Sequence, residues 1–452
     1  MEKFESGGAV TLKFGTDGVR GVAYVELTTD LVRALGTAAA QVLGGPAFLI
    51  GRDTRASGPD LQAALADGLA AAGADVIDLG VLPTPAVAHN SAVERLPAAM
   101  ISASHNPYQD NGVKFFLAGG RKLSDEVEAE LEAAMARTAA TPTRSGGRLS
   151  TAPGPTAGYE RHVLDSIEGR TLHGLTVVID CANGAAFDVA PRVLRTLGAD
   201  VHVLHDQPDG QNINAGCGST HPGDLQAAVV ERGADAGLAF DGDADRVLAV
   251  DHTGALVDGD QLMAVLALDL RDQGRLHDDT LVVTVMSNLG LRLAMADAGV
   301  RVHETQVGDR SVLEALEANG WSLGGEQSGH VILRDLATTG DGLLTGVQVL
   351  DAVRRRGRPL ADLAAVMARL PQVLRNVRVA RRDGLDDAQA VWDAVAAVER
   401  RLGRSGRVLL RPSGTEPVVR VMVEAGDEAT AQAAADELAA VVGEWGEFEA
   451  RA

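Results

Sequence analysis

The segment DGDADR carries aspartates at positions 241, 243 and 245, between the apolar runs GLAF and VLAV. Short apolar runs are typical of buried strands, so the acidic segment is predicted to be a turn between two strands. Three carboxylates so close together repel one another, and a cation relieves that repulsion. Mg²⁺ takes oxygen ligands and keeps positions open for phosphate or water, so we expect Asp241, Asp243 and Asp245 to bind it. Arg246 beside them fits a site that also holds an anion.

Two other interpretations of the acidic segment were weighed. The calcium loop of an EF-hand also begins with alternating acids, but it needs glycine at its sixth position and glutamate at its twelfth. The chain has Arg246 and His252 there, so the EF-hand interpretation fails. A solvated acidic turn without a metal stays open as the alternative, although the buried-type strands on both sides argue against it.

Ser104 and His105 stand side by side in ISASHNPYQDNGVKFF, after the apolar run PAAMIS. The run is predicted to be a buried strand, which puts Ser104 at its carboxyl end. Adjacent side chains diverge in extended backbone and in turns, so we expect His105 to be poorly placed to take the Ser104 proton. The GxSxG elbow of a hydrolase is also missing here. A Ser-His-Asp hydrolase is therefore disfavoured.

RPSGTEPVVR, residues 411–420, has the composition of a phosphate-binding turn. Backbone N–H groups and hydroxyls in such a turn, with arginines that donate two hydrogen bonds each, can hold phosphate oxygens. An ordinary Ser/Gly turn is the alternative. The candidate phosphate-binding residues are Arg411, Ser413, Gly414, Thr415 and Arg420.

Three further polar segments are weaker candidates on their own. GGEQSGH, residues 324–330, has donors and acceptors at alternate positions that can contact adjacent sugar hydroxyls, or it is a solvated loop. FGTDGVRG places Arg20 in a glycine-flanked loop near the N-terminus. GRDTR, residues 51–55, follows a buried strand and so lies at a carboxyl end, where α/β proteins build their sites.

The elements that must position these residues repeat along the chain. A helical tail, a glycine and an alternating strand recur in residues 69–78, 194–203 and 293–303, and the glycine suits a helix end with positive φ. Continuous apolar runs precede the helices, as in parallel α/β sheets. We expect three α/β domains of one kind, with chance similarity among αβ proteins as the alternative. VLLRPSGTEPVVRVMVE and the Ala-rich helix after it predict a small α+β unit with an antiparallel hairpin.

The predicted domain limits follow polar or Pro/Gly-rich joints. The clearest is the linker at 141–158, and others are expected near residue 258 and near residues 370–377. The predicted domains are 1–155 with Ser104, 156–258 with the aspartates, 259–371 with GGEQSGH, and 372–452 with the phosphate-binding turn.

Charge and composition exclude several classes of partner. The 452 residues include 41 basic and 62 acidic ones, a net charge of −21, which argues against nucleic acid or an anionic membrane as partner. The two cysteines, Cys181 and Cys217, offer no disulfide framework. The chain shows no signal peptide and no apolar stretch of about 18 residues, so we expect a soluble cytoplasmic protein.

Five segments, in this order, resemble the signatures of the α-D-phosphohexomutase family: FGTDGVRG, ISASHNPYQDNGVKFF, GLAFDGDADR, GGEQSGH and RPSGTEPVVR. The resemblance spans nearly the whole chain. It implies three similar α/β/α domains with mixed sheets and a smaller C-terminal α+β domain, arranged around a central cleft. One departure is VGDRSV, where Ser311 stands in place of the family's tyrosine and leaves the packing of that loop open.

The resemblance also implies a role for each motif. Ser104 is the phosphoserine, and its phosphate joins the three aspartates around one Mg²⁺ per chain. Glu326 and Ser328 contact sugar hydroxyls, and the 411–420 turn holds the non-reacting phosphate. Arg246 lies against the transferring phosphoryl group. The candidates for proton transfer or charge stabilisation are Lys114, Arg20 and His330.

The implied reaction interconverts glucosamine 6-phosphate and glucosamine 1-phosphate for amino-sugar and cell-wall precursor synthesis. Glucosamine 1,6-bisphosphate is its intermediate and activator. Glucose or mannose phosphates are the nearest alternative substrates. A non-catalytic sugar-phosphate binding protein and a metal-dependent phosphatase are alternatives of other classes. The resemblance further implies a homodimer.

Overall fold

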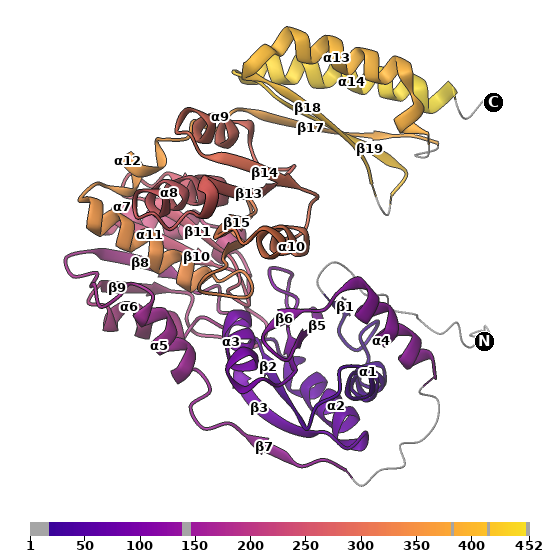
Figure 1. Cartoon of the computed structure of the whole chain (residues 1–452), viewed down its shortest axis with the longest axis vertical. Coiled ribbons are helices and arrows are strands. Elements are labelled where there is room, and N and C mark those ends of the chain that lie inside the picture. The colour runs from indigo at the N-terminus through magenta and orange to yellow at the C-terminus, as the bar shows by residue number, and fades with distance from the viewer. Residues whose placement is uncertain (1–17, 138–145, 381–383, 414–415, 449–452) are drawn as a thin grey trace. The chain divides into compact units, whose positions relative to one another are not determined.

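A computed structural model describes residues 18–137, 146–380, 384–413 and 416–448 (Figure 1). The chain divides into two compact units. The first comprises residues 1–286 and 300–365, and the second comprises residues 287–299 and 366–452.

The first sheet of the first unit has seven strands in the order β1-β5-β4-β2-β3-β7, with β6 paired to β5. Strands β2, β3, β4 and β7 run parallel, whereas β5 is antiparallel to both β4 and β1. The strands are β1 (Val19–Val22), β2 (Ala47–Arg52), β3 (Asp75–Val81), β4 (Ala98–Ile101), β5 (Asp110–Leu117), β6 (Arg121–Lys122) and β7 (Leu149–Thr151). The helices are α1 (Thr29–Val42), α2 (Gly58–Ala71), α3 (Thr84–Glu94) and α4 (Asp125–Arg137).

The second sheet has the order β12-β11-β10-β8-β9. Strands β8, β9 and β10 are parallel, and β11 is antiparallel to β10. The strands are β8 (Thr176–Asp180), β9 (Asp200–Leu204), β10 (Ala236–Phe240), β11 (Val247–Asp251) and β12 (Leu256–Val257). The helices are α5 (Ala157–Asp165), α6 (Val189–Thr196) and α7 (Gly223–Arg232).

The third sheet has the order β14-β13-β15-β16. Strands β13, β14 and β15 are parallel, and β16 is antiparallel to β15. The strands are β13 (Thr280–Thr284), β14 (Arg301–Thr305), β15 (Leu323–Gly325) and β16 (Val331–Leu333). The helices are α8 (Gly259–Asp272), α10 (Asp309–Asn319), α11 (Gly342–Arg356) and α12 (Leu360–Ala364).

The second unit contains an antiparallel sheet in the order β17-β19-β18. Helices α13 and α14 lie side by side on one face of this sheet (Figure 1). The small α+β unit predicted from the sequence is confirmed. Its elements are β17 (Gln372–Arg378), β18 (Arg407–Pro412), β19 (Val418–Glu424), α13 (Gln389–Leu402) and α14 (Glu428–Phe448), joined by α9 (Leu289–Asp297).

The predicted repetition is real, and it extends to strand order. In each of the first three sheets, three successive parallel strands lie in the order third, first, second, and the next strand pairs antiparallel with the third. The glycines that follow α2, α6 and α9 all have positive φ, 94° at Gly73, 91° at Gly198 and 75° at Gly299, as a helix C′ position requires.

This repetition explains the position of the candidate residues. The serine, aspartate and GGEQSGH segments are the β4–β5, β10–β11 and β15–β16 connections, so they occupy the same topological position in three sheets. In each case the connection leaves the carboxyl end of a parallel strand, the edge where α/β sheets bind ligands.

Part of the predicted linker is not a linker. Residues 138–145 lie outside the described residues, but β7 pairs in parallel with β3 at the edge of the first sheet. Two of the backbone hydrogen bonds at this edge join Val76 N to Arg148 O and Ala152 N to Asp78 O. A three-residue edge strand is too short to show the alternation by which strands are recognised in a sequence.

Candidate active site

The aspartate segment is a tight loop that begins after Phe240, the last residue of β10, and ends before Val247, the first residue of β11. Asp241, Asp243 and Asp245 are buried, and one carboxylate oxygen of each lies within 4.8 Å of the others. The three aspartates predicted to form one site are therefore adjacent in the structure.

The charge of this cluster is only partly balanced by the protein. Burial, and then the neighbouring carboxylates of Asp245 and Asp243, raise the pKa of Asp241 well above its usual range. Lys114 Nζ lies 2.9 Å from Asp243 Oδ2 and 3.4 Å from Asp245 Oδ2. Burial opposes the charge of Arg246, but the carboxylates of Asp245 and Asp241 outweigh it and raise its pKa.

The cluster fits a hard divalent cation. The Oδ1 atom of Asp245 is buried and has no hydrogen-bond partner within the described residues, and its ion-pair contact with Arg246 Nε is long, at 3.7 Å. A buried carboxylate oxygen without a donor is costly unless a cation contacts it. The donor set consists of carboxylate oxygens, the ligand type that Mg²⁺ prefers.

Ser104 lies against this cluster. Its Oγ donates a hydrogen bond of 2.6 Å to Asp241 Oδ2, across two sheets of the first unit. The residue is buried and has φ of 52°, a left-handed conformation that is strained for a side chain other than glycine. Strain of this kind persists only where the surrounding contacts impose it.

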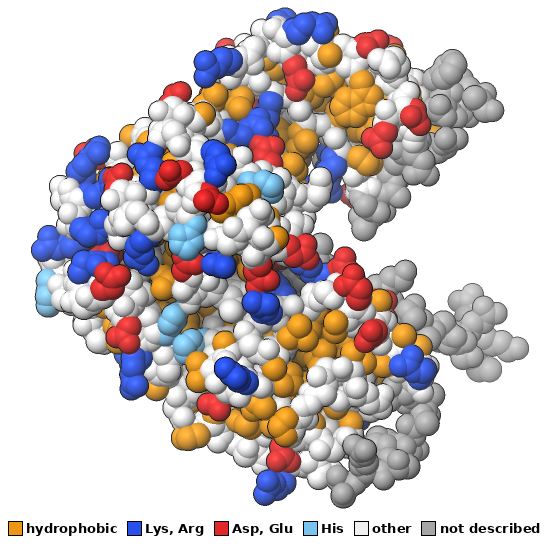
Figure 2. Space-filling view, in the orientation of Figure 1, with side chains coloured by type: hydrophobic (Ala, Val, Ile, Leu, Met, Phe, Trp, Pro, Cys, Tyr) orange, Lys and Arg blue, Asp and Glu red, His pale blue; other side chains and the backbone are white. Residues whose placement is uncertain are grey.

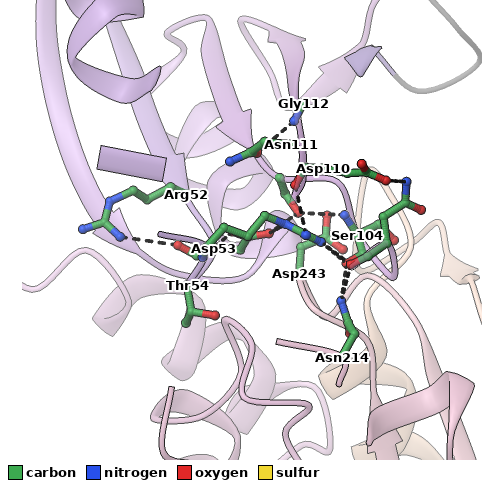
Figure 3. Close-up of polar contacts among 12 residues, drawn as sticks. Arg52, Asp53, Thr54, Ser104, Asp110, Asn111, Gly112, Asn214 and Asp243 are labelled. Atoms are coloured by element: carbon green, nitrogen blue, oxygen red, sulfur yellow. Dashed lines mark hydrogen bonds and ion pairs between the residues drawn. The ribbon is translucent and has the colours of Figure 1, made fainter. Parts of the chain in front are cut away.

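Those contacts come from Arg55 and Asn214. Figure 3 shows the Asn214 side chain directed at Ser104. The carbonyl of Ser104 accepts hydrogen bonds of 2.9 Å from Arg55 Nη2 and 2.9 Å from Asn214 Nδ2, and its N–H donates to Ser102 Oγ at 2.9 Å. Both ends of the residue are thus held, which leaves Oγ directed at the aspartates.

Arg55 holds the whole serine loop. Its side chain is fully buried, and its guanidinium also donates to the carbonyls of Asn106 at 2.9 Å, Asp110 at 3.1 Å and Pro107. Its Nε pairs with Asp53 Oδ2 at 2.9 Å. The planar guanidinium therefore sets the loop's shape through donors in fixed directions.

The expectation for His105 was wrong. Its Nδ1 lies 3.2 Å from Ser104 Oγ, so the two neighbouring side chains converge. The reason is the positive φ of Ser104, which differs from the extended backbone expected where a strand ends. Burial, followed by the charges of Arg246 and Arg20, lowers the pKa of His105, so these two arginines lie near it as well.

The remaining cations of the site come from β1 and β5. Lys114 lies on β5, buried between the first sheet and the aspartate loop. Arg20 lies on β1 in register with Gly112 of β5, and a Cβ at Gly112 would come within 2.9 Å of the Arg20 Cγ. The glycine in DNGVKFF therefore leaves room for Arg20.

The GGEQSGH segment is a hairpin turn that packs on the aspartate loop. Val247 N, next to Arg246, donates to Gly329 O at 3.1 Å. Glu326 Oε1 accepts a hydrogen bond from Gly308 N at 3.2 Å. The Oγ of Ser328 is buried and has no hydrogen-bond partner within the described residues, as expected of a group that binds a ligand.

His330 lies beneath the aspartates and connects them to α10. Its Nε2 is 3.4 Å from Asp309 Oδ2 and 4.0 Å from Asp245 Oδ2, and its side chain is buried. Asp309 in turn pairs with Lys122 of β6. This places Asp309, from the VGDRSV segment, within the same network, although the sequence did not single it out as a site residue.

The candidate phosphate-binding residues lie in the second unit. Arg411 of β18 and Arg420 of β19 are direct partners in the antiparallel register. Like charges opposite one another destabilise a strand pair, and an anion between them would remove that cost. Ser413 is buried, and its Oγ accepts a hydrogen bond from Glu416 N at 3.3 Å. Gly414 and Thr415 lie outside the described residues.

Two residues that contact the site had no clear signal in the sequence. Asn214 belongs to a loop of the second sheet and reaches the serine loop of the first. Thr84, at the start of α3, donates its Oγ1 to Asp243 Oδ2 at 2.7 Å. Arg55 belongs to GRDTR, which did carry a signal, because it follows a buried strand.

Acidic and basic side chains are interspersed over the face in view in Figure 2. The described helices include none that is both long and apolar enough to cross a membrane.

Comparison with known proteins identifies relatives along nearly the whole chain. Models of the phosphoglucomutase/phosphomannomutase family match in order: α/β/α domain I over residues 11–141, domain II over 157–254, domain III over 258–370 and the C-terminal domain over 374–441. A phosphoglucosamine mutase of Thermobifida fusca (strain YX) is 58% identical over 442 residues, which cover 96% of this chain and 98% of the relative.

Solved structures share the fold. A phosphoglucomutase/phosphomannomutase family protein from Burkholderia thailandensis has a TM-score of 0.81 and 26% identity, and the match covers 96% of this chain and 97% of that one. An N-acetylphosphoglucosamine mutase from Aspergillus fumigatus, solved with GlcNAc-6P and magnesium, has a TM-score of 0.69 and 18% identity, with 96% of each chain covered.

Proposed function

The chain belongs to the phosphoglucomutase/phosphomannomutase family, and we propose that it interconverts glucosamine 6-phosphate and glucosamine 1-phosphate. The observation that carries the proposal is the 2.6 Å contact between Ser104 Oγ and Asp241 in the buried aspartate cluster. The choice of the amino sugar rests on the 58% identity to a phosphoglucosamine mutase. The product would supply amino-sugar and cell-wall precursor synthesis.

Ser104 carries a phosphoryl group in the proposed resting enzyme. In the first transfer, the bond between phosphorus and Ser104 Oγ breaks. A new bond forms between phosphorus and the C1 hydroxyl oxygen of glucosamine 6-phosphate. The C1 hydroxyl loses its proton in this step, and Ser104 Oγ gains one. The product, glucosamine 1,6-bisphosphate, turns over, and its 6-phosphoryl group returns to Ser104, leaving the 1-phosphate. The bisphosphate is the intermediate of the proposed reaction, and it is also expected to be the activator.

The protein's contribution is alignment and charge neutralisation, since phosphoryl transfer needs little covalent chemistry from a protein. Asp241, Asp243 and Asp245 would hold Mg²⁺ together with the Ser104 phosphate. When bound, Mg²⁺ neutralises charge on the phosphoryl oxygens. Arg55 and Asn214 keep Ser104 in the conformation that presents its Oγ.

The other cations offset the charge of the substrate. Lys114, Arg20 and Arg246 surround the serine loop and the aspartates, and a phosphoserine and a sugar phosphate each bring about −1.5 to −2 charge. Lys114, Arg20 and His330 are the candidates for proton transfer. Glu326 and Ser328 are proposed to contact sugar hydroxyls, and the residues around Arg411 and Arg420 to bind the non-reacting phosphate.

Intact-mass measurement before and after phosphatase treatment tests the phosphoserine. We expect wild type to lose the mass of one phosphoryl group, Ser104→Ala to show no such change, and only wild type to isomerise hexose phosphates. Ser150→Ala, on the exposed edge strand β7, should keep the phosphoryl group. If wild type never carries phosphate on Ser104 and isomerises no hexose phosphate, a non-catalytic binding protein is the better description. Release of free phosphate would indicate a phosphatase.

Substrate preference is a separate question. Comparing kcat/KM for the 6-phosphates of glucosamine, glucose and mannose tests it directly, and a clear preference for mannose or glucose would overturn the choice of amino sugar. The homodimer and the cytoplasmic location expected from the sequence stay predictions.

A further inference from the structure

A second group of metal-ligand side chains lies in the second sheet, apart from the aspartate loop. Asp180 is the last residue of β8, and His205 follows β9 directly. Cys217 comes from the loop that precedes α7. One ligand atom of each residue lies within 4.8 Å of the others. Asp180 and His205 meet because β8 and β9 are parallel neighbours whose carboxyl ends share one edge.

The three side chains differ from an ordinary polar cluster in burial and in donor type. Asp180 and Cys217 are fully buried, and the His205 side chain is 28% exposed. Together they offer a carboxylate oxygen, an imidazole nitrogen and a sulfur. Zn²⁺ and similar borderline-soft cations are bound by these atom types, whereas Mg²⁺ prefers oxygen alone.

One ring nitrogen of the imidazole lies close to the Asp180 carboxylate without forming a hydrogen bond. His205 Nδ1 is buried and lies 3.1 Å from Asp180 Oδ2, yet it has no hydrogen-bond partner within the described chain. Two ligand atoms of a tetrahedral Zn²⁺ stand about 3.5 Å apart, close to this spacing. The other ring nitrogen, Nε2, is 3.4 Å from Asp224 Oδ2, the carboxylate contact that orients metal-binding histidines.

The internal repetition supplies an independent argument for a cation. Asp53 follows β2, the strand equivalent to β8, and each aspartate accepts a hydrogen bond from the backbone N–H two residues later, at Arg55 or Ala182. In the first sheet the Arg55 guanidinium neutralises the buried carboxylate. In the second sheet that position is an alanine, and within the described residues His205 is the ion-pair partner of Asp180.

We propose that Asp180, His205 and Cys217 bind one thiophilic divalent cation of the Zn²⁺ class, with the fourth position open to water. Both oxygens of Asp180 accept backbone hydrogen bonds, from Ala182 N and Gly218 N, each at 2.9 Å, and each oxygen keeps a second lone pair for a metal. The cation would neutralise the buried Asp180 carboxylate, as the Arg55 guanidinium neutralises Asp53 in the first sheet.

The site would join the loops that support the active site. Asn214, which holds the Ser104 carbonyl, is three residues before Cys217. Ala185 N, in the loop after Asp180, donates to Gly242 O between the aspartates at 2.8 Å. A cation that connects these loops would stabilise the position of Asn214, which holds the Ser104 carbonyl, without contacting the reacting atoms.

Titration with Co²⁺ in place of Zn²⁺ tests the proposal on the full chain, with Mg²⁺ in large excess. We expect one equivalent of Co²⁺ to give a thiolate-to-cobalt charge-transfer band and the strong visible bands of tetrahedral Co²⁺, both removed by Zn²⁺. The band should disappear in Cys217→Ser and in His205→Ala, and persist in the matched control Cys181→Ser. Asp224→Asn should weaken binding about tenfold or more, as loss of an outer-shell partner does.

Two outcomes would overturn the proposal. The first is the absence of a thiolate band in wild type at saturating Co²⁺, which leaves an ordinary His205–Asp180 ion pair. The second is an unchanged band in both Cys217→Ser and His205→Ala. His205 is partly exposed, so its alanine variant keeps the test decisive should Cys217→Ser fail to fold. The Co²⁺ spectrum does not depend on mutase activity, so the metal site is tested independently of the proposed reaction.

Discussion

At the scale of single residues, the most informative feature is the left-handed conformation of Ser104. It turns the Oγ toward Asp241 and brings the His105 ring to the same oxygen. A backbone conformation of this kind costs about 1–3 kcal/mol, and contacts must compensate for it. Arg55 and Asn214 provide them through the Ser104 carbonyl.

Arg55→Lys tests this positioning role. Lysine keeps the charge but loses the fixed donor geometry that holds four carbonyls of the serine loop. We expect kcat to fall about a hundredfold with little change in KM, since a small misplacement of a reacting group has such an effect. Steady-state kinetics on the glucosamine phosphates measures it.

Arg52→Lys is the matched control for this variant. Arg52 is also cationic and lies at the end of β2, but within the described residues its guanidinium donates one long hydrogen bond, of 3.4 Å, to the Asp53 carbonyl. We expect near wild-type kinetics from it. A rise in KM with unchanged kcat in Arg55→Lys would contradict a positioning role and indicate substrate binding instead.

At the scale of elements, one topological rule positions the site. The three connections that leave the third parallel strand of each repeated sheet carry Ser104, the aspartates and Glu326. The aspartate loop is also contacted by the first turns of α3 and α11, through Thr84 N to Asp243 O at 2.9 Å and Gly342 N to Ala244 O at 3.0 Å. The aspartate loop is therefore held by helices as well as by the two strands that it connects.

The N-cap of α11 gives a test at this scale. Asp341 caps the helix through Leu344 N and accepts a hydrogen bond from the Tyr159 hydroxyl at 2.7 Å. Burial raises its pKa from 3.8 to about 6. The folded protein therefore binds the proton more tightly than the unfolded chain, and this contribution to stability is lost as pH rises from the unfolded to the folded pKa.

Asp341→Asn removes that titration and keeps a good N-cap. We expect the variant to gain about 3 kcal/mol in free energy of unfolding relative to wild type between about pH 4 and pH 7, from a shift of about two pKa units. Urea denaturation of both proteins across this range measures the difference. A difference that stays constant with pH would show that Asp341 does not titrate there.

At the scale of the whole molecule, the proposed reaction divides its tasks between the two units. The serine, the aspartates and the turn proposed to contact the sugar belong to the first unit, and the candidate phosphate-binding arginines belong to the second. Arg411 and Arg420 face each other across a strand pair, so their repulsion favours an anion.

Arg420→Ala separates the two tasks. Loss of a charge-assisted hydrogen bond costs about 1.5–3 kcal/mol, so we expect KM for both sugar phosphates to rise about tenfold to a hundredfold. Phosphorylation of Ser104, followed by intact mass, should be unchanged. Arg375→Ala is the control, because Arg375 lies on β17 of the same sheet and pairs with the exposed Asp436 of α14. Loss of Ser104 phosphorylation in Arg420→Ala would contradict this division.

Much of the fold and the site follows from local patterns in the sequence. Apolar runs predicted β2, β8 and β13, glycines predicted the ends of α2, α6 and α9, and the alternating aspartates predicted the loop between β10 and β11. These features depend on neighbouring residues alone, so they are readable along the chain. The short edge strand β7 was read as a linker, because its pairing depends on a distant strand.

The contacts that orient Ser104 depend on distant residues and could not be read this way. Asn214 follows Ser104 by more than a hundred residues, and it contacts the serine loop only because the first two sheets pack together. The convergence of Ser104 and His105 requires a positive φ that long-range hydrogen bonds impose. Residue types and strand ends were local properties of the chain, whereas the direction of the Ser104 hydroxyl oxygen came from packing between sheets.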